Sequence, residues 1–451
     1  MKIILATPSR NIRVIKKARP TPHAAEPATT PTQLPPDSLG WSLLLAARVL
    51  AAVRGGKSLS EALGMLAGEV PPARAAAQDI AYGVLRAFGR GEHILGRLLS
   101  KPLSHAPTYA LLLAALYRLE TRPDAAHTVV DQAVKAAGEL AGGVFKGLVN
   151  GVLRNYLRQR DVLLGSLAGN EEATFQHPVW WLNRLRRRWP QEWQKIVAAD
   201  NAPPPLILRV NGRRASAADY LMRLESAGLR GSRVGERGIR LAEAVPVDAL
   251  PGFHDGDVSV QDAGAQRAAE LLAPVAGMRV LDACAAPGGK SAHLLEMADV
   301  DLMAIDIDAA RARRIEENLT RLGLKARVQV GDASMPSAWW DGKKFDAILA
   351  DVPCTASGVV RRHPDIKMLR RESDVRQFAR TQVAILDALW PLLKPGGRLL
   401  YATCSVFVEE NQAQIDAFLV RQQNASRLLV EQWLPCDDND GFYYALLGKA
   451  D

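Results

Sequence analysis

Hydrophobic positions recur at helical spacing through the first third of the chain, from Asp37 to about Arg160. Ala and Leu dominate this stretch, and no strand-like alternation interrupts it. The pattern predicts an all-α bundle over residues 38–170. The expected helices are Ser42 to Val53, Ser58 to Leu66, Ala73 to Ala87, Glu92 to Leu99, Pro107 to Tyr117, His127 to Leu140 and Phe145 to Arg158.

The pattern becomes mixed over residues 171–270. A helix rich in Trp and Arg, from Trp180 to Trp189, leads to a proline-rich break at Pro203 to Pro205. Short strand-like segments and one helix follow, which predicts a small α+β domain that contacts RNA or links its neighbours. Arg beside aromatic residues can stack on RNA bases, although Trp more often belongs to a core. The expected elements are strands at Leu206 to Val210, Gly238 to Ala242 and Val258 to Gln261 and a helix at Ala217 to Ala227.

Strand and helix signals alternate from Leu271 to the end of the chain. Buried strands separated by helices are typical of a doubly wound, Rossmann-like α/β fold with a parallel sheet. We therefore expect one α/β domain over residues 271–451. Its expected strands are Arg279 to Asp282, Leu302 to Asp306, Ala326 to Val330, Ala347 to Ala350 and Arg398 to Thr403.

The first 37 residues differ from the rest of the chain. Met1 to Arg19 is basic and lacks the apolar core of a signal peptide, and Pro20 to Pro36 contains six prolines. We expect residues 1–37 to form a disordered extension. No run of about 18 uncharged apolar residues occurs, which predicts a soluble protein without a membrane partner.

The net charge of +9 is concentrated at the front of the chain. Residues 1–170 hold 21 Lys and Arg against 11 Asp and Glu, whereas residues 271–451 hold 22 against 24. This asymmetry indicates that the N-terminal half binds a polyanion. The alternative is that its basic residues form a solvated surface. Four cysteines without a close CxxC pair argue against a disulfide framework or a structural zinc site and favour a reducing cytoplasm.

A turn of small residues follows the first strand of the α/β domain and opens a helix. It runs from Cys284 to Lys290 and lets a ligand approach backbone N–H groups closely, because glycine has no side chain. The spacing is not that of a dinucleotide fingerprint. Three further acids, Asp306, Asp332 and Asp351, follow successive strands, at the edge where this fold binds ligands. Any one of them can be a loop cap, but the ordered series predicts an adenosine cofactor.

Two cysteines also follow strands and should lie at the same edge of the sheet. Cys354 stands in Asp351-Val352-Pro353-Cys354, and Cys404 stands in Ala402-Thr403-Cys404-Ser405. A buried small hydrophobe is the alternative for either cysteine alone. A reactive thiol needs positive charge nearby, for which Lys290 is a candidate, whereas Glu409 and Glu410 would oppose ionisation if they faced Cys404.

The motifs at this edge resemble the Sun/Fmu family of bacterial small-subunit ribosomal RNA cytosine-C5 methyltransferases. The likeness rests on residues 282–290, 351–371, 401–411 and 440–444, and the helical region resembles the NusB-like RNA-binding domain of that family. It implies S-adenosyl-L-methionine as cofactor and small-subunit ribosomal RNA as partner. The cofactor-binding positions that it implies are Cys284, Ala285, Ala286, Pro287, Gly288, Gly289, Lys290, Asp306, Arg311, Asp332 and Asp351.

The same resemblance assigns unequal roles to the two thiols. Cys404 matches the nucleophile, and Cys354 matches the thiol associated with product release. Cytosine C5 is a poor nucleophile, so a thiolate that adds to C6 would activate it. A carboxylic acid at N3 or N4 would favour this addition by neutralising charge that develops on the ring, and Asp351, close to Cys354 in sequence, is the candidate.

Other functions stay open at this point. A DNA cytosine-C5 methyltransferase would use Cys354 as nucleophile and carry a Glu-Asn-Val motif, which is absent, so no DNA partner is expected. A transfer RNA or large-subunit ribosomal RNA enzyme is an alternative, as is a non-catalytic RNA-binding or assembly protein. With no long exposed heptad pattern, we expect a monomer.

Overall fold

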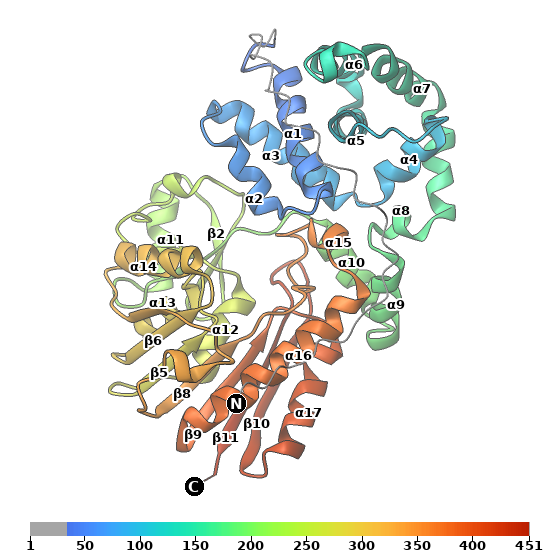
Figure 1. Cartoon of the computed structure of the whole chain (residues 1–451). Coiled ribbons are helices and arrows are strands. Elements are labelled where there is room, and N and C mark those ends of the chain that lie inside the picture. The colour runs from blue at the N-terminus through green and yellow to red at the C-terminus, as the bar shows by residue number, and fades with distance from the viewer. Residues whose placement is uncertain (1–33, 451) are drawn as a thin grey trace, which may run out of the picture.

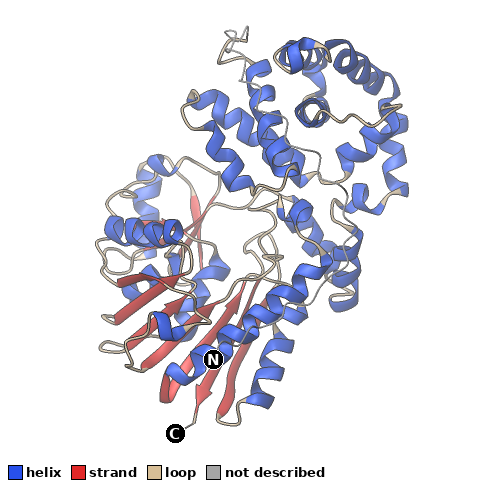
Figure 2. Cartoon of the chain, in the orientation of Figure 1, coloured by secondary structure: helices blue, strands red, loops and turns tan. Residues whose placement is uncertain are grey.

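The computed structural model describes residues 34–450, which form a helical domain, a small α+β domain and a larger α/β domain (Figure 1). The helical domain lies at one end of the molecule, where Figure 2 shows only blue helices, and the red strands of the large sheet lie at the other end. Most of the predicted extension 1–37 lies outside the described residues. Leu34, within it, is buried against the helical core, so packed structure begins ahead of Ser38.

The helical domain is built around α1, which is apolar on nearly every side and packs against α3, α5 and α6. The Ser38 hydroxyl begins α1 by accepting a hydrogen bond from the Trp41 N–H at 3.1 Å. All seven predicted helices are present, which confirms the all-α prediction. They are α1 (Leu39–Arg54), α2 (Leu59–Leu63), α3 (Pro71–Arg86), α4 (Arg90–Leu98), α5 (Ala106–Thr121), α6 (Ala126–Gly138) and α7 (Lys146–Gly165).

Three helices connect the helical domain to the α/β domain: α8 (Glu171–Phe175), α9 (Val179–Arg188) and α10 (Trp193–Asn201). The Trp/Arg-rich sequence forms α9. Its Trp181 is fully buried in a cluster with Phe407 of the α/β domain, and Arg184 pairs with Glu409. These side chains hold two domains together, so the core interpretation of Trp181 is the correct one and it is not free to stack on RNA.

The small domain contains a four-stranded antiparallel sheet of order β2-β3-β1-β4. Helix α11 (Ala217–Ser226) packs on it, and the three predicted strands are present. The additional strand β2 was not predicted because its exposed residues carry no apolar alternation. The strands are β1 (Ile207–Val210), β2 (Gly231–Val234), β3 (Gly238–Leu241) and β4 (Val258–Val260).

The α/β domain holds a seven-stranded sheet of order β10-β11-β9-β8-β5-β6-β7. Strands β5 to β9 are parallel, which confirms the Rossmann-like prediction, whereas β10 and β11 add an antiparallel pair that was not predicted. The strands are β5 (Arg279–Ala283), β6 (Asp301–Asp306), β7 (Arg327–Val330), β8 (Phe345–Asp351), β9 (Leu393–Thr403), β10 (Ala425–Trp433) and β11 (Phe442–Lys449).

Helices cover both faces of this sheet. Alternate residues of β5 point to opposite faces: Leu281 packs with α16 (Glu372–Leu389) and α17 (Gln412–Arg421), and Val280 packs with the other group. That group is α12 (Ala263–Leu272), α13 (Gly289–Met297) and α14 (Ala309–Leu322). The predicted boundary between residues 270 and 271 therefore falls inside α12, a helix of the larger core. Across residues 34–450, none of the helices is both long and apolar enough to cross a membrane.

Candidate active site

The carboxyl ends of the parallel strands bring all the predicted site residues to one edge of the sheet. The turn from Cys284 follows β5, Asp306 ends β6, Asp332 follows β7, Asp351 ends β8 and Cys404 follows β9. This edge faces the small domain and the helical domain in Figure 1. Parallel pairing of β8 with β5 and β9 puts the turn, Asp351 and Cys404 side by side.

The turn between β5 and α13 is shaped to approach a ligand closely. Cys284 adopts a left-handed φ of 63°, and the Ala285 N–H bonds to the carbonyl of Ile305 on β6 at 2.8 Å. Gly288 has a φ of 94°, and a Cβ there would lie 3.0 Å from Ile315 Cγ2, so this position requires glycine. A Cβ on Gly289 would meet nothing nearer than 3.7 Å, which leaves space at the start of α13.

Asp306, the last residue of β6, stabilises the turn between β5 and α13. Its Oδ2 accepts a hydrogen bond from the Ala286 N–H at 3.2 Å, and Arg311 Nη2 lies 3.3 Å from the same oxygen. Its Oδ1 accepts from the Asp308 N–H at 3.1 Å. Asp332 caps its own loop, because Oδ1 accepts from the Ser334 N–H and hydroxyl at 2.8 and 2.7 Å. Both acids therefore organise loops at the edge where the sequence placed a cofactor.

A buried acid, Asp282, lies beneath the turn. The Ser291 hydroxyl donates to its Oδ2 at 2.5 Å, while Oδ1 has no partner within residues 34–450. Complete burial, together with the nearby negative charge of Asp351, raises the pKa of Asp282 to about 7.

Lys290 and Asp351 form an ion pair next to the thiols. The Lys290 Nζ lies 2.7 Å from Asp351 Oδ2, and the two side chains are 14% and 26% exposed. Burial alone would lower the pKa of Lys290, but Asp351, Cys404 and Asp282 together raise it. Lys290 therefore carries a positive charge within electrostatic range of Cys404, as a cation that assists a thiolate must.

The two cysteines are in contact. Their sulfur atoms lie 3.5 Å apart, and both thiols are free. Cys354 is the deeper one, at 8% exposure, whereas Cys404 is half-buried. The hydrogen bond to Cys404 and burial raise the pKa of Cys354 well above its usual range. Cys354 therefore keeps its proton at neutral pH.

The buried carboxyl group of Glu410 is hydrogen-bonded to both segments that carry the thiols, the one after Cys354 and the one after Cys404. It accepts hydrogen bonds from the Thr355 N–H at 2.8 Å, from the Thr355 hydroxyl at 2.5 Å and from the Ser405 hydroxyl at 2.5 Å. Burial raises the pKa of Glu410. From the sequence, Glu409 and Glu410 would oppose ionisation of Cys404 if they faced it. Instead Glu410 holds the residues that directly follow each thiol, and Glu409 points to Arg184.

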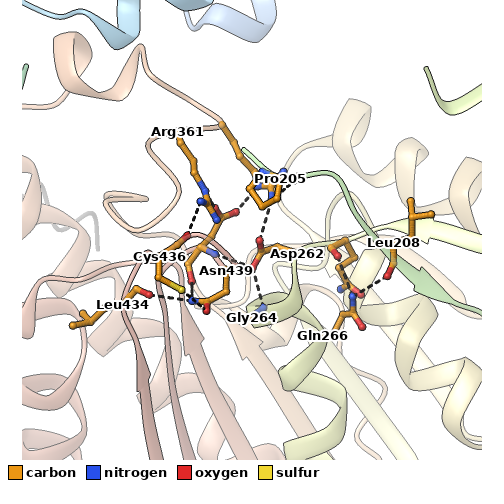
Figure 3. A network of polar contacts seen from close by, with 12 residues as sticks. Pro205, Leu208, Asp262, Gly264, Gln266, Arg361, Leu434, Cys436 and Asn439 are labelled. Atoms are coloured by element: carbon orange, nitrogen blue, oxygen red, sulfur yellow. Dashed lines mark hydrogen bonds and ion pairs between the residues drawn. The ribbon is translucent and has the colours of Figure 1, made fainter. Parts of the chain in front are cut away.

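Further buried ions hold the segment after Cys354 and were not predicted. Arg361 Nε donates to Asp440 Oδ1 at 2.5 Å, and Arg362 donates to Asp440 and, at 2.9 Å, to Asp262. Figure 3 shows Arg361 and Asp262 converging on the segment around Cys436 and Asn439. The two adjacent charges of Arg361 and Arg362 were the sequence feature that pointed to these contacts. Adjacent arginines, however, usually indicate a solvated surface.

The sheet, the small-residue turn and the row of acids at its carboxyl edge define a methyltransferase domain of the Rossmann-like class. Comparison with known proteins extends this to the whole chain. A family model described as 16S rRNA methyltransferase RsmB/F matches residues 269–448, a ferredoxin-like domain of RsmF/B-like methyltransferases matches 177–248, and the NusB family matches 42–158.

Relatives cover almost the full length. The ribosomal RNA small subunit methyltransferase B of Cronobacter sakazakii is 45% identical over 427 residues, which is 91% of this chain and 99% of the relative. That of Salmonella arizonae is 43% identical over 420 residues, 90% of this chain and 98% of the relative. A crystal structure of a methyltransferase homolog from Pyrococcus horikoshii matches with a TM-score of 0.55 and 27% identity, covering 62% and 97%. The chain belongs to the ribosomal RNA small subunit methyltransferase B family and is a 16S ribosomal RNA methyltransferase.

Proposed function

We propose that the protein transfers a methyl group from S-adenosyl-L-methionine to C5 of a cytosine in 16S ribosomal RNA, through a covalent bond between Cys404 and C6. The observation that carries the proposal is the pair of thiols 3.5 Å apart beside the Lys290–Asp351 ion pair. Methylation of a cytosine at C5 requires a nucleophile that adds to C6 and a second group that assists release, and the two thiols are suited to these roles.

The turn and acids at the sheet edge suit an adenosine cofactor. Residues 284–290 would hold its amino acid portion, Asp306 with Arg311 the ribose, and Asp332 the adenine. Open space next to Gly289 and the small side chains of Ala285 and Ala286 leave room for close approach. When bound, S-adenosyl-L-methionine supplies an electrophilic methyl group on a sulfonium.

Cys404 provides the nucleophile. Its thiolate forms a bond to C6, and the electron pair of the C5–C6 double bond shifts toward C5, which would make C5 able to take the methyl group of a bound sulfonium as the methyl–sulfur bond breaks. Asp351, held by Lys290, accepts a hydrogen bond from the exocyclic amine, and the Lys290 charge offsets the negative charge that develops on the ring. After methyl transfer, C5 holds a proton that must leave before the Cys404–C6 bond can break.

Cys354 is suited to that release because its charge state depends on Cys404. The hydrogen bond between the thiols is the largest cause of its raised pKa, and negative charge on Cys404 adds to it. Negative charge on Cys404 disappears once its sulfur is bonded to carbon, whereas burial and Glu410 continue to raise the pKa of Cys354. The Cys354 thiol gives its proton to water, its thiolate takes the C5 proton, the C5–C6 double bond re-forms and the Cys404 thiolate leaves.

Methyl transfer to RNA that lacks the modification tests this function. The enzyme is incubated with labelled S-adenosyl-L-methionine and unmodified small-subunit ribosomal RNA, and the RNA is then digested to nucleosides. We expect label in 5-methylcytidine, and none with the Cys404→Ala variant. Label in another nucleoside would refute the C5 assignment, and label only in transfer RNA or large-subunit RNA would refute the substrate.

A further inference from the structure

The segment that follows the release thiol, residues 354–368, contacts all three domains, and we name it the Cys354 loop. It ends in the short helix α15 (Ile366–Leu369), which lies against the helical domain in Figure 1. Loops that carry reacting groups are positioned by a rigid scaffold. For the Cys354 loop, that scaffold includes the helical domain as well as the α/β domain.

The far end of the Cys354 loop is bonded to the helical domain. The Leu59 N–H, at the start of α2, donates to Asp365 Oδ2 at 2.9 Å. Lys367 Nζ donates to the carbonyl of Arg86, at the end of α3, at 2.8 Å and to Asn201 Oδ1 at 2.7 Å. The Met368 side chain packs against the core of the helical domain. The helical domain is thus attached to the loop by directed bonds and by apolar contact.

The middle and near end of the loop are bonded to the thiol pair. Arg361 and Arg362 hold Asp440, and the Gly441 N–H donates to the Gly358 carbonyl at 2.7 Å. The Gly358 N–H in turn donates to the carbonyl of Cys404 at 2.9 Å. Figure 3 shows Arg361 in this network, where its Nη1 also donates to the Cys436 carbonyl at 2.7 Å. The loop is therefore bonded to the helical domain at its far end and to the segment of Cys404 nearer its start.

Lys367 is an unusual choice for a domain contact. Its side chain is 1% exposed, and burial lowers its pKa to about 7, partly opposed by Asp200. Asp365 is 5% exposed. A buried charged group adds little to stability compared with an apolar residue of similar size, whereas its hydrogen bonds have a defined direction. We infer that these bonds align the loop with the helical domain, and that the Met368 contact adds apolar packing.

We propose that the helical domain positions Cys354 against Cys404 through Asp365 and Lys367, which act as positioning residues for release of the RNA adduct. The proposal rests on the proposed function, in which Cys354 accepts the C5 proton. It predicts a defect at one step only. Variants that break the contact still bind RNA and transfer a first methyl group, but they release the adduct slowly.

The experiment compares Lys367→Met and Asp365→Ala with three references. Asp365→Asn keeps an oxygen that can accept from Leu59, Lys344→Met removes an exposed lysine at the opposite edge of the sheet, and Cys354→Ala removes the release thiol. Methyl groups transferred per enzyme, covalent protein–RNA complex on denaturing gels, RNA affinity by filter binding and thermal unfolding are measured on each full-length variant.

We expect Lys367→Met and Asp365→Ala to transfer about one methyl group per enzyme and then turn over about tenfold or more slowly, with covalent complex accumulating and RNA affinity within about twofold. Asp365→Asn and Lys344→Met should turn over like the wild type. The positioning role is wrong if Cys354→Ala accumulates the covalent complex but Lys367→Met and Asp365→Ala do not. This holds whether the latter two variants turn over at the normal rate or form neither complex nor methylated RNA. If Cys354→Ala itself accumulates none, the proposed function fails.

Discussion

Replacing Glu410 by Ala should separate the two thiols. The substitution removes the acceptor of three hydrogen bonds and leaves the Thr355 N–H buried without a partner. Hydrogen bonds to a charged group contribute about 1.5–3 kcal/mol each and do not add fully, so we expect the free energy of unfolding to fall by about 4 kcal/mol. Because Thr355 and Ser405 each follow a thiol, the rate of methyl transfer should fall by about a hundredfold.

Glu409→Ala is the matched control, one residue away. The Glu409 side chain is 42% exposed and pairs with Arg184, and such a pair contributes at most about 1 kcal/mol. Unfolding in urea gives the stabilities, and single-turnover transfer of labelled methyl gives the rates. Glu410→Gln, which keeps one acceptor oxygen, should lie between the other two variants. Equal stabilities and equal rates for Glu410→Ala and Glu409→Ala would refute the role assigned to this carboxyl.

Two further substitutions test the site from other directions. Asp282 has a pKa of about 7 in the folded protein and 3.8 as its ordinary value, so the folded state binds the extra proton between these limits and stability falls as pH rises through them. The difference in unfolding free energy between wild type and Asp282→Asn should therefore change by about 3 kcal/mol from pH 5 to pH 8 in urea titrations, and no change would contradict the burial argument. Gly441→Ala would place a Cβ 2.8 Å from Gly358 Cα, so we expect a loss of about 1–3 kcal/mol in the same assay. Gly147→Ala, in an open helical position, should instead be neutral or stabilising, and similar values for both would contradict the packing.

The sequence was sufficient for the elements whose pattern is local. Strands β6, β8 and β9 each contain a continuous apolar run. The chemistry at the strand ends follows from the rule that ligands bind at the carboxyl edge of a parallel sheet. Strands β10 and β11 were missed. Most of β10 is partly exposed, and its pairing with β11 depends on residues that are not adjacent in sequence.

The buried polar contacts could not be predicted in the same way. Glu410 bonds to Thr355, 55 positions earlier, and Arg361 bonds to Asp440, 79 positions later. A charged residue in sequence is far more often solvated than buried, so only the folded chain reveals that these groups face each other. The Trp-rich helix α9 shows the same limit, because its composition alone suited either RNA or a core.

The order of the two thiols is the central claim, and trapping of covalent RNA complexes tests it most directly. Cys354→Ala, Cys404→Ala and the wild type are incubated with S-adenosyl-L-methionine and unmodified small-subunit RNA, then separated on denaturing gels. We predict that Cys354→Ala accumulates a covalent complex and that Cys404→Ala forms none and transfers no methyl group. A covalent complex with Cys404→Ala, and none with Cys354→Ala, would reverse the roles and contradict the account.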